Sequence, residues 1–210
     1  MQAVSEYEAV LDTEPQNTEA LYNLGLVLKN LKEPETAVAR FREVISYQPN
    51  HIGALNNLGT TLEGIVNKQE ALTSLRKAAD LAPDNFVIIF NLAKRQKDFY
   101  EWESAETNYR KVLEINKNFS PANTNLANLM RDTGRLDEAM VIYRGLLSSA
   151  SDLSNAHSDY LANLNYVCED NNEIIYRESL EWEHRHGTSP KKTYSKFSNK
   201  KVATRRLKIG

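Results

Sequence analysis

Four asparagines recur at a constant interval, and they are the side chains of this sequence best suited to bind another molecule. They are Asn23, Asn57, Asn91 and Asn125. A carboxamide offers two N–H donors and one acceptor, so each side chain could pair with the N–H and C=O groups of an extended peptide without reading its side chains. The alternative is a solvated polar face without a ligand. Further candidates for the same surface are Tyr22, Asn56, Phe90, Thr124, Lys94, Asn128, Lys97 and Arg131.

Residues that could support catalysis or hold a metal are few and scattered. His184 and His186 lie beside Glu181 and Glu183. A His-x-His pair can ligate a metal, but residues two apart on a helix point in different directions, which favours a polar helix surface. Cys168 has no histidine near it in the sequence to activate it, and no glycine-rich phosphate loop or nucleophile motif occurs. The sequence therefore predicts no catalytic residue, no metal site, no cofactor and no enzymatic activity for this chain.

The asparagines belong to a 34-residue repeat that covers roughly the first three quarters of the chain. Each asparagine is followed by Leu and then by Gly or Ala, and other residue types recur at the same interval. Small residues stand at Ala3, Ala37, Ala71, Ala105 and Ala139, bulky ones at Tyr7, Phe41, Leu75, Tyr109 and Tyr143, and prolines at Pro15, Pro49 and Pro83. Helical spacing closed by a proline turn predicts one helix-turn-helix unit per period.

These residues resemble the tetratricopeptide (TPR) repeat family, whose pattern has Leu-Gly in helix A, a small Ala and an aromatic residue in helix B, and a closing Pro. The resemblance implies an all-α fold, a right-handed superhelical solenoid whose A helices line a concave groove. The Asn before each packed Leu would project into that groove. The units would be a C-terminal half repeat at 1–17, full repeats at 18–51, 52–85, 86–119 and 120–153, a degenerate repeat with a divergent capping helix at 154–187, and a basic linker at 188–210.

Within each unit, the sequence predicts close helix crossings and capped helix ends. Gly25 and Gly59 are expected to face Ala37 and Ala71, because larger side chains would clash there. The residues expected to cap the A helices are Asn17, Asn50, Asp84 and Ser120. After residue 151 the register is expected to slip by one. The first helix would lack its partner, so its apolar face would be covered by a preceding repeat or by a homodimer contact.

Composition and charge are typical of a helical protein. Apolar residues make up 41% of the chain, and Cys168 is the only cysteine, which excludes an intramolecular disulfide. No leader or membrane span is visible, so a cytoplasmic location and no membrane partner are expected. The net charge is −2, but residues 188–210 hold eight basic and no acidic side chains, which leaves −10 for the other residues. Such a tail could bind nucleic acid or rest against the acidic solenoid.

A second resemblance concerns the C-terminal part of the chain. The segment Leu161–Tyr166, a helix bearing Trp182 and the final Arg206–Gly210 are similar to the junction in bacterial and plant-type (SPINDLY-like) O-GlcNAc transferases. In that family the repeat array passes through a Leu-Asn-Tyr segment and a Trp-bearing helix to a catalytic domain. The family's His-Arg before the Trp is replaced here by Ser179 and Leu180.

The resemblance implies that this chain is the substrate-recognition arm of a protein glycosyltransferase whose catalytic domain follows. Such an enzyme transfers N-acetylglucosamine or a related sugar to Ser or Thr, and its asparagine ladder holds extended protein or peptide substrates. Two other classes of function stay open. One is a free-standing adaptor between proteins without a link to glycosylation. The other is a nucleic-acid binder acting through the tail, which is disfavoured because no nucleic-acid-binding fold accompanies it.

Overall fold

The computed structural model describes residues 2–62, 68–149, 154–167 and 172–187, and these ranges contain eleven α-helices and no strand. The helices are α1 (Gln2–Thr13), α2 (Thr18–Asn30), α3 (Pro34–Tyr47), α4 (Ile52–Thr61), α5 (Lys68–Leu81), α6 (Phe86–Asp98), α7 (Trp102–Ile115), α8 (Ser120–Asp132), α9 (Leu136–Ser149), α10 (Ser154–Val167) and α11 (Asn172–His186). Consecutive helices pack side by side. The predicted all-α helical repeat fold is confirmed.

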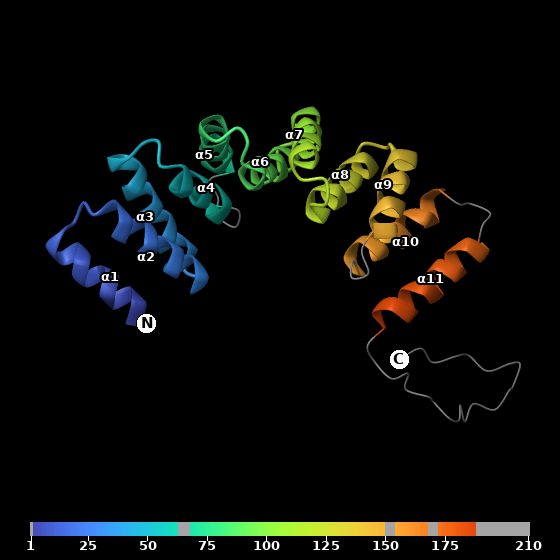
Figure 1. The fold of residues 1–210 in the computed structure, drawn as a ribbon, viewed down its shortest axis with the longest axis horizontal. Helices are drawn as coiled ribbons and strands as arrows, with labels where there is room; N and C mark the ends of the chain where they lie inside the picture. The colour runs from blue at the N-terminus through green and yellow to red at the C-terminus, as the bar shows by residue number, and fades with distance from the viewer. Residues whose placement is uncertain (1, 63–67, 150–153, 168–171, 188–210) are drawn as a thin grey trace, which may run out of the picture.

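The helices form an arch with two faces (Figure 1). The inner helices, α2, α4, α6, α8 and α10, contact one another in sequence along the concave side. The outer helices, α1, α3, α5, α7 and α9, alternate with them, and Figure 1 shows α5, α7 and α9 along the convex side. Each face of the arch is therefore built from one helix of every pair: the inner helices form the concave face and the outer helices form the convex face.

The core repeats with the same period as the sequence. The alanines from Ala37 to Ala139 that recur at this interval are fully buried, and so are the bulky residues four positions later. These bulky residues are Phe41, Leu75, Tyr109 and Tyr143, each at 0% exposure. Because each unit contributes the same side chains to the space between inner and outer helices, the core runs along the arch instead of forming one centre.

The two inner-helix glycines lie where helices approach closely, but their neighbours differ from the prediction. A Cβ added to Gly25 would lie 2.7 Å from Cε1 of Phe41, and one added to Gly59 would lie 2.4 Å from Cγ of Leu75. The glycines therefore leave room mainly for the bulky residue of the outer helix. The predicted partner Ala71 contributes only a backbone oxygen, 3.0 Å from the Gly59 position.

The predicted helix caps are correct at the first unit and wrong at the next three. Asn17 Oδ1 accepts a hydrogen bond from the N–H of Ala20 at 3.0 Å. The helices α4 and α6 begin one residue later in the unit than expected, so their caps are His51 and Asn85. The cap of α8 is Phe119, which makes no side-chain hydrogen bond. The residues wrongly predicted as caps are Asn50, Asp84 and Ser120.

The predicted register slip after residue 151 is wrong. Buried residues of α10 follow those of α8 by one unchanged period, with Ala156, Tyr160, Asn163 and Leu164 matching Ala122, Leu126, Leu129 and Met130. Ala162, on which the slip was based, is exposed. Burial thus continues with the original period because α10 packs against α8 and α9 as an ordinary inner helix.

The turn that leads from an inner to an outer helix uses a left-handed residue at a fixed place in the period. Lys32, Tyr100 and Gly134 have φ values of 62°, 60° and 80°. They occupy equivalent positions in the first, third and fourth full repeats. Only the last of them is a glycine, the residue that adopts this conformation without a steric cost.

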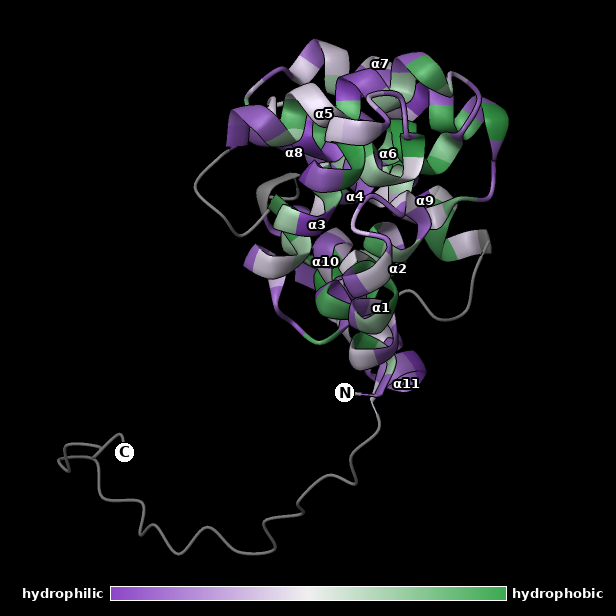
Figure 2. Cartoon of the chain, turned by 90° about the vertical axis from the view of Figure 1, so that its left-hand side faces the viewer, coloured by the Kyte–Doolittle hydropathy of each residue, from purple (hydrophilic) through white to green (hydrophobic). Residues whose placement is uncertain are grey.

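The two ends of the arch are less well packed than its middle. Neither α1 nor α11 has a buried residue. On α1, Val4, Tyr7 and Leu11 pack against the core of the first units, whereas Val10 is 39% exposed although Val44, its equivalent in α3, is fully buried. Figure 2 views the molecule from this end, and α1 lies in front with both hydrophobic and hydrophilic residues on its surface. Of the apolar face predicted to be uncovered in residues 1–17, the structure thus leaves Val10 exposed, while Val4, Tyr7 and Leu11 are packed against the core.

Other predictions fall outside the described residues. These are Cys168 and the basic linker 188–210. Among the helices that the structure describes, none has the length and apolar character needed to cross a bilayer.

Candidate functional site

The inner helices place the four asparagines of the ladder on the concave face. In each case the following residues, Leu and then Gly or Ala, are buried in the core. Asn23, Asn57, Asn91 and Asn125 are each partly buried, at the edge between core and groove. Their side-chain contacts differ from one unit to the next, so the ladder is regular in sequence and irregular in hydrogen bonding.

Asn57 has the most complete set of partners. Its Nδ2 donates to Oη of Tyr22 at 3.1 Å and to the carbonyl oxygen of Gly53 at 2.9 Å. Its Oδ1 accepts from Nζ of Lys29 at 3.1 Å, and the same ammonium donates to Thr60 Oγ1 at 2.8 Å. Since Tyr22 and Lys29 belong to α2, the amide of Asn57 ties two successive inner helices together.

Asn91 and Asn56 form the same kind of bridge one unit further along. Nδ2 of Asn91 on α6 donates to Oδ1 of Asn56 on α4 at 2.9 Å. Both residues were predicted as groove candidates, and the structure brings them into direct contact. Part of the hydrogen-bonding capacity of this pair is therefore used between helices.

The first and last asparagines of the ladder, Asn23 and Asn125, do not bridge successive inner helices. Asn125 donates from Nδ2 to the carbonyl oxygen of Pro121 in its own helix at 2.9 Å, and its Oδ1 has no partner among the described residues. Asn23 makes no side-chain hydrogen bond within the same part of the chain. Among the described residues, their carboxamides retain unused donors or acceptors, as does the Oδ1 of Asn91.

Asn128 links three helices at the other end of the groove. Oη of Tyr143 on α9 donates to Oδ1 of Asn128 at 2.6 Å, and Nδ2 of Asn128 reaches Oδ2 of Asp159 on α10 at 3.4 Å. Burial, with Asp159 nearby, raises the pKa of the Tyr143 phenol, which keeps this hydroxyl protonated as a donor. Asp159 follows Asn125 by one period and takes the ladder position in α10.

Two aromatic groove candidates, Tyr22 and Phe90, pack against other aromatic rings. The ring of Tyr22 lies 4.8 Å from that of His51 and 6.1 Å from that of Phe41. Phe90 meets Phe119 edge to face at 5.1 Å. His51 and Phe119 cap α4 and α8, so both rings pack against the start of the next inner helix. The remaining candidates, Thr124 and Lys94, are partly buried.

An ion pair joins two inner helices, and the sequence did not predict it. Nζ of Lys97 on α6 lies 2.8 Å from Oδ2 of Asp132 on α8, and Arg131 lies 3.0 Å from the same carboxylate. Burial raises the pKa of Asp132, but the hydrogen bonds from Lys97 and Arg131 outweigh it, and the pKa lies below its ordinary value. Lys97 and Arg131 occupy the same position in the repeat as Lys29. This recurrence of basic residues could have predicted a charged contact on the inner helices.

The convex face is held by arginine–glutamate pairs, which the sequence reasoning also missed. Arg42 on α3 donates to Glu70 on α5 from Nε at 2.8 Å and from Nη2 at 2.6 Å. Arg76 on α5 reaches both carboxylate oxygens of Glu101 at 2.6 and 2.7 Å. The signal was present, because arginines recur with the period of the repeat at Arg42, Arg76, Arg110 and Arg144.

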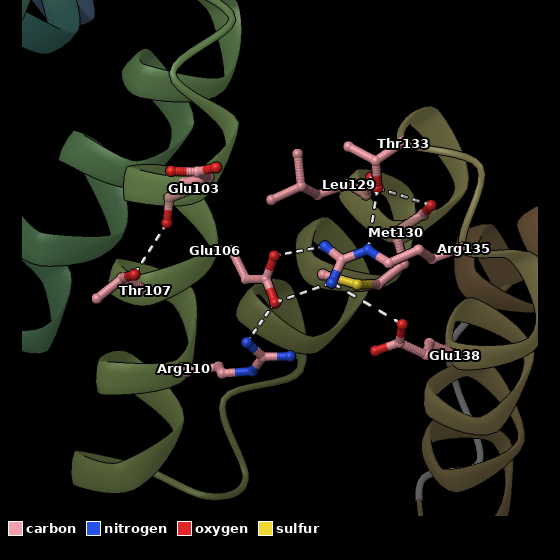
Figure 3. Close-up of polar contacts among 9 residues, drawn as sticks. All are labelled: Glu103, Glu106, Thr107, Arg110, Leu129, Met130, Thr133, Arg135 and Glu138. Atoms are coloured by element: carbon pink, nitrogen blue, oxygen red, sulfur yellow. Dashed lines mark hydrogen bonds and ion pairs between the residues drawn. The ribbon is translucent and has the colours of Figure 1, made fainter.

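The third convex pair belongs to a larger cluster between α7 and α9 (Figure 3). Arg135 approaches Glu106 with both terminal nitrogens, and Arg110 contacts the same carboxylate from the other side. Arg135 also lies 3.8 Å from Glu138. The hydrogen bond from Arg135 is the main reason why the pKa of Glu106 lies below its ordinary value.

The histidines that suggested a metal site are separated by the helix on which they lie. His186 faces His157 of α10, with 3.3 Å between its Nε2 and Nδ1 of His157, while His184 is exposed. Burial and the nearby His186 lower the pKa of His157. No group of three or more potential metal-binding side chains occurs among the described residues.

Two segments match sequence models of the tetratricopeptide repeat. The matched residues are 6–39 and 52–85. These two segments are therefore identified as tetratricopeptide repeats. No curated protein sequence matches the chain at a significant level.

Solved structures of several bacterial repeat proteins share the fold. A tetratricopeptide repeat protein from Parabacteroides merdae is 18% identical with a TM-score of 0.75, over 87% of this chain and 72% of that one. MamA is 19% identical with a TM-score of 0.71, over 81% and 93%. YrrB, described as a TPR protein with an unusual peptide-binding site, is 15% identical with a TM-score of 0.68, over 87% and 93%. At these identities the likeness concerns the fold.

Proposed function

We propose that this chain is a protein-binding scaffold that holds an extended segment of another protein in its concave groove, with the repeat units bounded as the sequence predicts. The observation that carries this proposal is the position of the ladder. One partly buried asparagine stands on each of four successive inner helices, and Asn23 and Asn125 do not use their amides to join units. The peptide-binding site attributed to YrrB, which has the same fold, supports the same class of function.

The ladder asparagines have two roles in this proposal. Asn57 and Asn91 fix the spacing of α2, α4 and α6 through their bridges. Asn23 lies on α2, the first helix of that segment, and Asn125 lies on α8, the inner helix after it. Their amides pair with the backbone of the bound peptide. Each amide forms two hydrogen bonds with the N–H and C=O groups of the peptide main chain and does not contact its side chains, so the groove accepts many sequences.

A peptide titration tests the proposal. An extended, fluorescein-labelled Ser/Thr-rich peptide is titrated with the full chain, with Asn23→Ala and with Asn125→Ala, and Asn50→Ala is the control because Asn50 is an exposed turn residue. Each groove variant should weaken binding by about fivefold to tenfold, since one or two hydrogen bonds are lost. Equal affinity in all four proteins would remove the ladder as the binding site.

The finer proposal is that the scaffold is the substrate-recognition arm of an O-GlcNAc transferase-like enzyme. The segments Leu161–Tyr166 and Arg206–Gly210 support it by their similarity to that family's junction. Sequencing the native gene on both sides of the region that encodes this chain tests it. A nucleotide-sugar-binding domain directly after Gly210 would support the transferase, and its absence would leave the adaptor, with peptide binding unaffected.

A further inference from the structure

The outer helices are joined by ion pairs along most of the arch, but α1 and α3 are not. Arg42 and Glu70 form the pair between α3 and α5. The residues that occupy the equivalent places one unit earlier are Glu8 on α1 and Thr36 on α3. A carboxylate and a hydroxyl cannot form an ion pair, so this junction lacks the bridge that closes the next one.

A cleft of about 620 Å³ opens at this junction, between α1, α2 and α3. Its apolar lining is Val4, Leu24, Leu28 and Leu31. Leu24 and Leu28 belong to the core and are 3% and 8% exposed, while Leu31 is 46% exposed. The apolar surface open to an entering side chain such as Phe therefore comes mainly from Leu31 and the partly buried Val4, above the nearly covered Leu24 and Leu28.

The rim of the cleft is acidic. Glu8 has no partner within the described residues, and the carboxylate of Glu33 only accepts a 3.4 Å hydrogen bond from Thr36. The one cation of the lining, Arg40, is held by both carboxylate oxygens of Glu43 at 3.0 and 2.8 Å. The helix α1 contains no basic residue at all. The rim thus favours a ligand that carries positive charge beside an apolar group.

This chain contains a segment with that chemistry. Residues 188–210 carry eight basic and no acidic side chains, and Phe197 stands next to Lys196 and before Lys200 and Lys201. The phenylalanine supplies the apolar group for the leucine-lined floor, and the lysines supply charge for Glu8 and Glu33. Tyr194, the other aromatic residue of this segment, has no lysine directly beside it.

The donor of the segment is a second copy. About ten residues separate Phe197 from the end of α11, and an extended chain of that length reaches about 35 Å. Figure 1 places α1 and α11 at opposite ends of the long axis of the arch.

We propose that the basic segment around Phe197 of one copy docks in the cleft between α1, α2 and α3 of another. Two copies that exchange these segments form a closed homodimer, and copies that do so in one direction form an open chain. The cleft opens between the outer helices α1 and α3, so this contact does not depend on the ladder.

Sedimentation of the protein with all 210 residues tests the proposal with three variants. Phe197→Ser removes the anchor, and the double variant Glu8→Arg/Thr36→Glu builds into this junction the pair that Arg42 and Glu70 form in the next. Each should weaken self-association at least tenfold, as expected for loss of one buried aromatic side chain. The control Glu114→Arg changes an exposed charge on α7, away from the cleft, and leaves Arg40 paired with Glu43.

Mixing the variants distinguishes docking from a general charge effect. The Phe197→Ser protein retains an intact cleft, and the Glu8→Arg/Thr36→Glu protein retains an intact tail. The mixture should therefore form a heterodimer, although neither protein associates alone. A wild-type chain that stays monomeric up to about 100 µM, or a mixture that remains monomeric, would overturn the proposal. Melting temperatures of the variants within a few degrees of the wild-type value establish that the variants fold.

Discussion

The concave and convex faces of this arch are joined from unit to unit by different interactions. On the concave side, the neutral amides of Asn57 and Asn91 bridge α2, α4 and α6 in partly buried positions, and one ion pair, Lys97 with Asp132, joins α6 to α8. On the convex side, charged pairs such as Arg42 with Glu70 bridge outer helices, and the arginine side chain is 51% exposed. The same repeat spacing is therefore maintained by two chemistries with different responses to salt and pH.

The difference supports the proposal that the concave face holds the ligand. Breaking a hydrogen bond between two partly buried amides leaves polar groups unpaired, which costs free energy. Because the amides are neutral, they hold the inner helices in place at any ionic strength. Exposed ion pairs are weak and screened by salt, so they add little rigidity. Fixed amides would be pre-organised for the peptide backbone that we propose as the ligand, whereas the convex pairs mainly oppose splaying of the outer helices.

The largest expected effect comes from the residue that both faces share. Phe41 is fully buried between α2 and α3 and lies against Gly25. Phe41→Ala should lower the free energy of unfolding by about 3–5 kcal/mol, because it leaves a cavity beneath both faces. Chemical denaturation measures the loss, and Phe41→Leu should lose less than half of it. A loss below about 1 kcal/mol would mean that the faces do not rest on a common core.

An intermediate effect is expected for the concave bridge. Asn57→Ala removes three hydrogen bonds and leaves Tyr22 and Lys29 without this partner, so stability should fall by about 1–2 kcal/mol. Asn23→Ala is the matched control, since Asn23 makes no such bond, and its effect should stay within about 0.5 kcal/mol. Urea titration compares the two. Equal losses would show that the bridge does not stabilise the array.

Acid should weaken the convex face before the concave amides. Hydrogen bonds from Arg42 and Arg135 hold the pKa values of Glu70 and Glu106 below that of an unfolded glutamate. These groups therefore contribute stability above about pH 4.3, and the contribution is lost as the pH falls through their folded pKa values.

The measurement is denaturant unfolding between pH 6 and pH 3 for wild type and for the double variant Glu70→Gln/Glu106→Gln. The double variant should show a flatter pH dependence below about pH 4.3. Asn57→Ala should keep the wild-type slope. Identical slopes in all three proteins would contradict the assignment of acid sensitivity to the convex pairs.

The smallest effect is expected for a single convex pair. Arg42→Ala should cost less than about 1 kcal/mol at low salt, because the pair is largely exposed. At 1 M NaCl, where the screening length is about 3 Å, the difference from wild type should vanish. A loss that persists at high salt would show that the aliphatic part of Arg42 matters more than its charge.

The sequence was sufficient for the fold because the signal repeats. Leu, Gly or Ala in inner helices and Ala with an aromatic in outer helices occur at one interval, and their burial follows it. The register of α10 was misjudged because Ala162 resembles a packing residue, whereas burial follows Tyr160 and Leu164. The caps of α4 and α6 were misjudged because His51 and Asn85, one residue further on, satisfy the same helix ends.

The groove was only partly predictable. The ladder positions were readable from spacing, and the structure places them at the edge of the concave face. Which amides are already occupied depends on partners that come from other units, such as Tyr22 and Lys29 for Asn57. Such pairings depend on side-chain rotamers across a helix contact, and residue type alone does not determine them.

The left-handed turn residues bear on how this array could be improved by design. Lys32 and Tyr100 adopt a conformation that costs an L-residue about 1–2 kcal/mol, while Gly134 adopts it freely. Tyr100 is also 80% exposed, so little packing offsets the cost. An engineer who wanted a more heat-resistant scaffold would begin at these two turns, where glycine removes strain and leaves the groove and the core untouched.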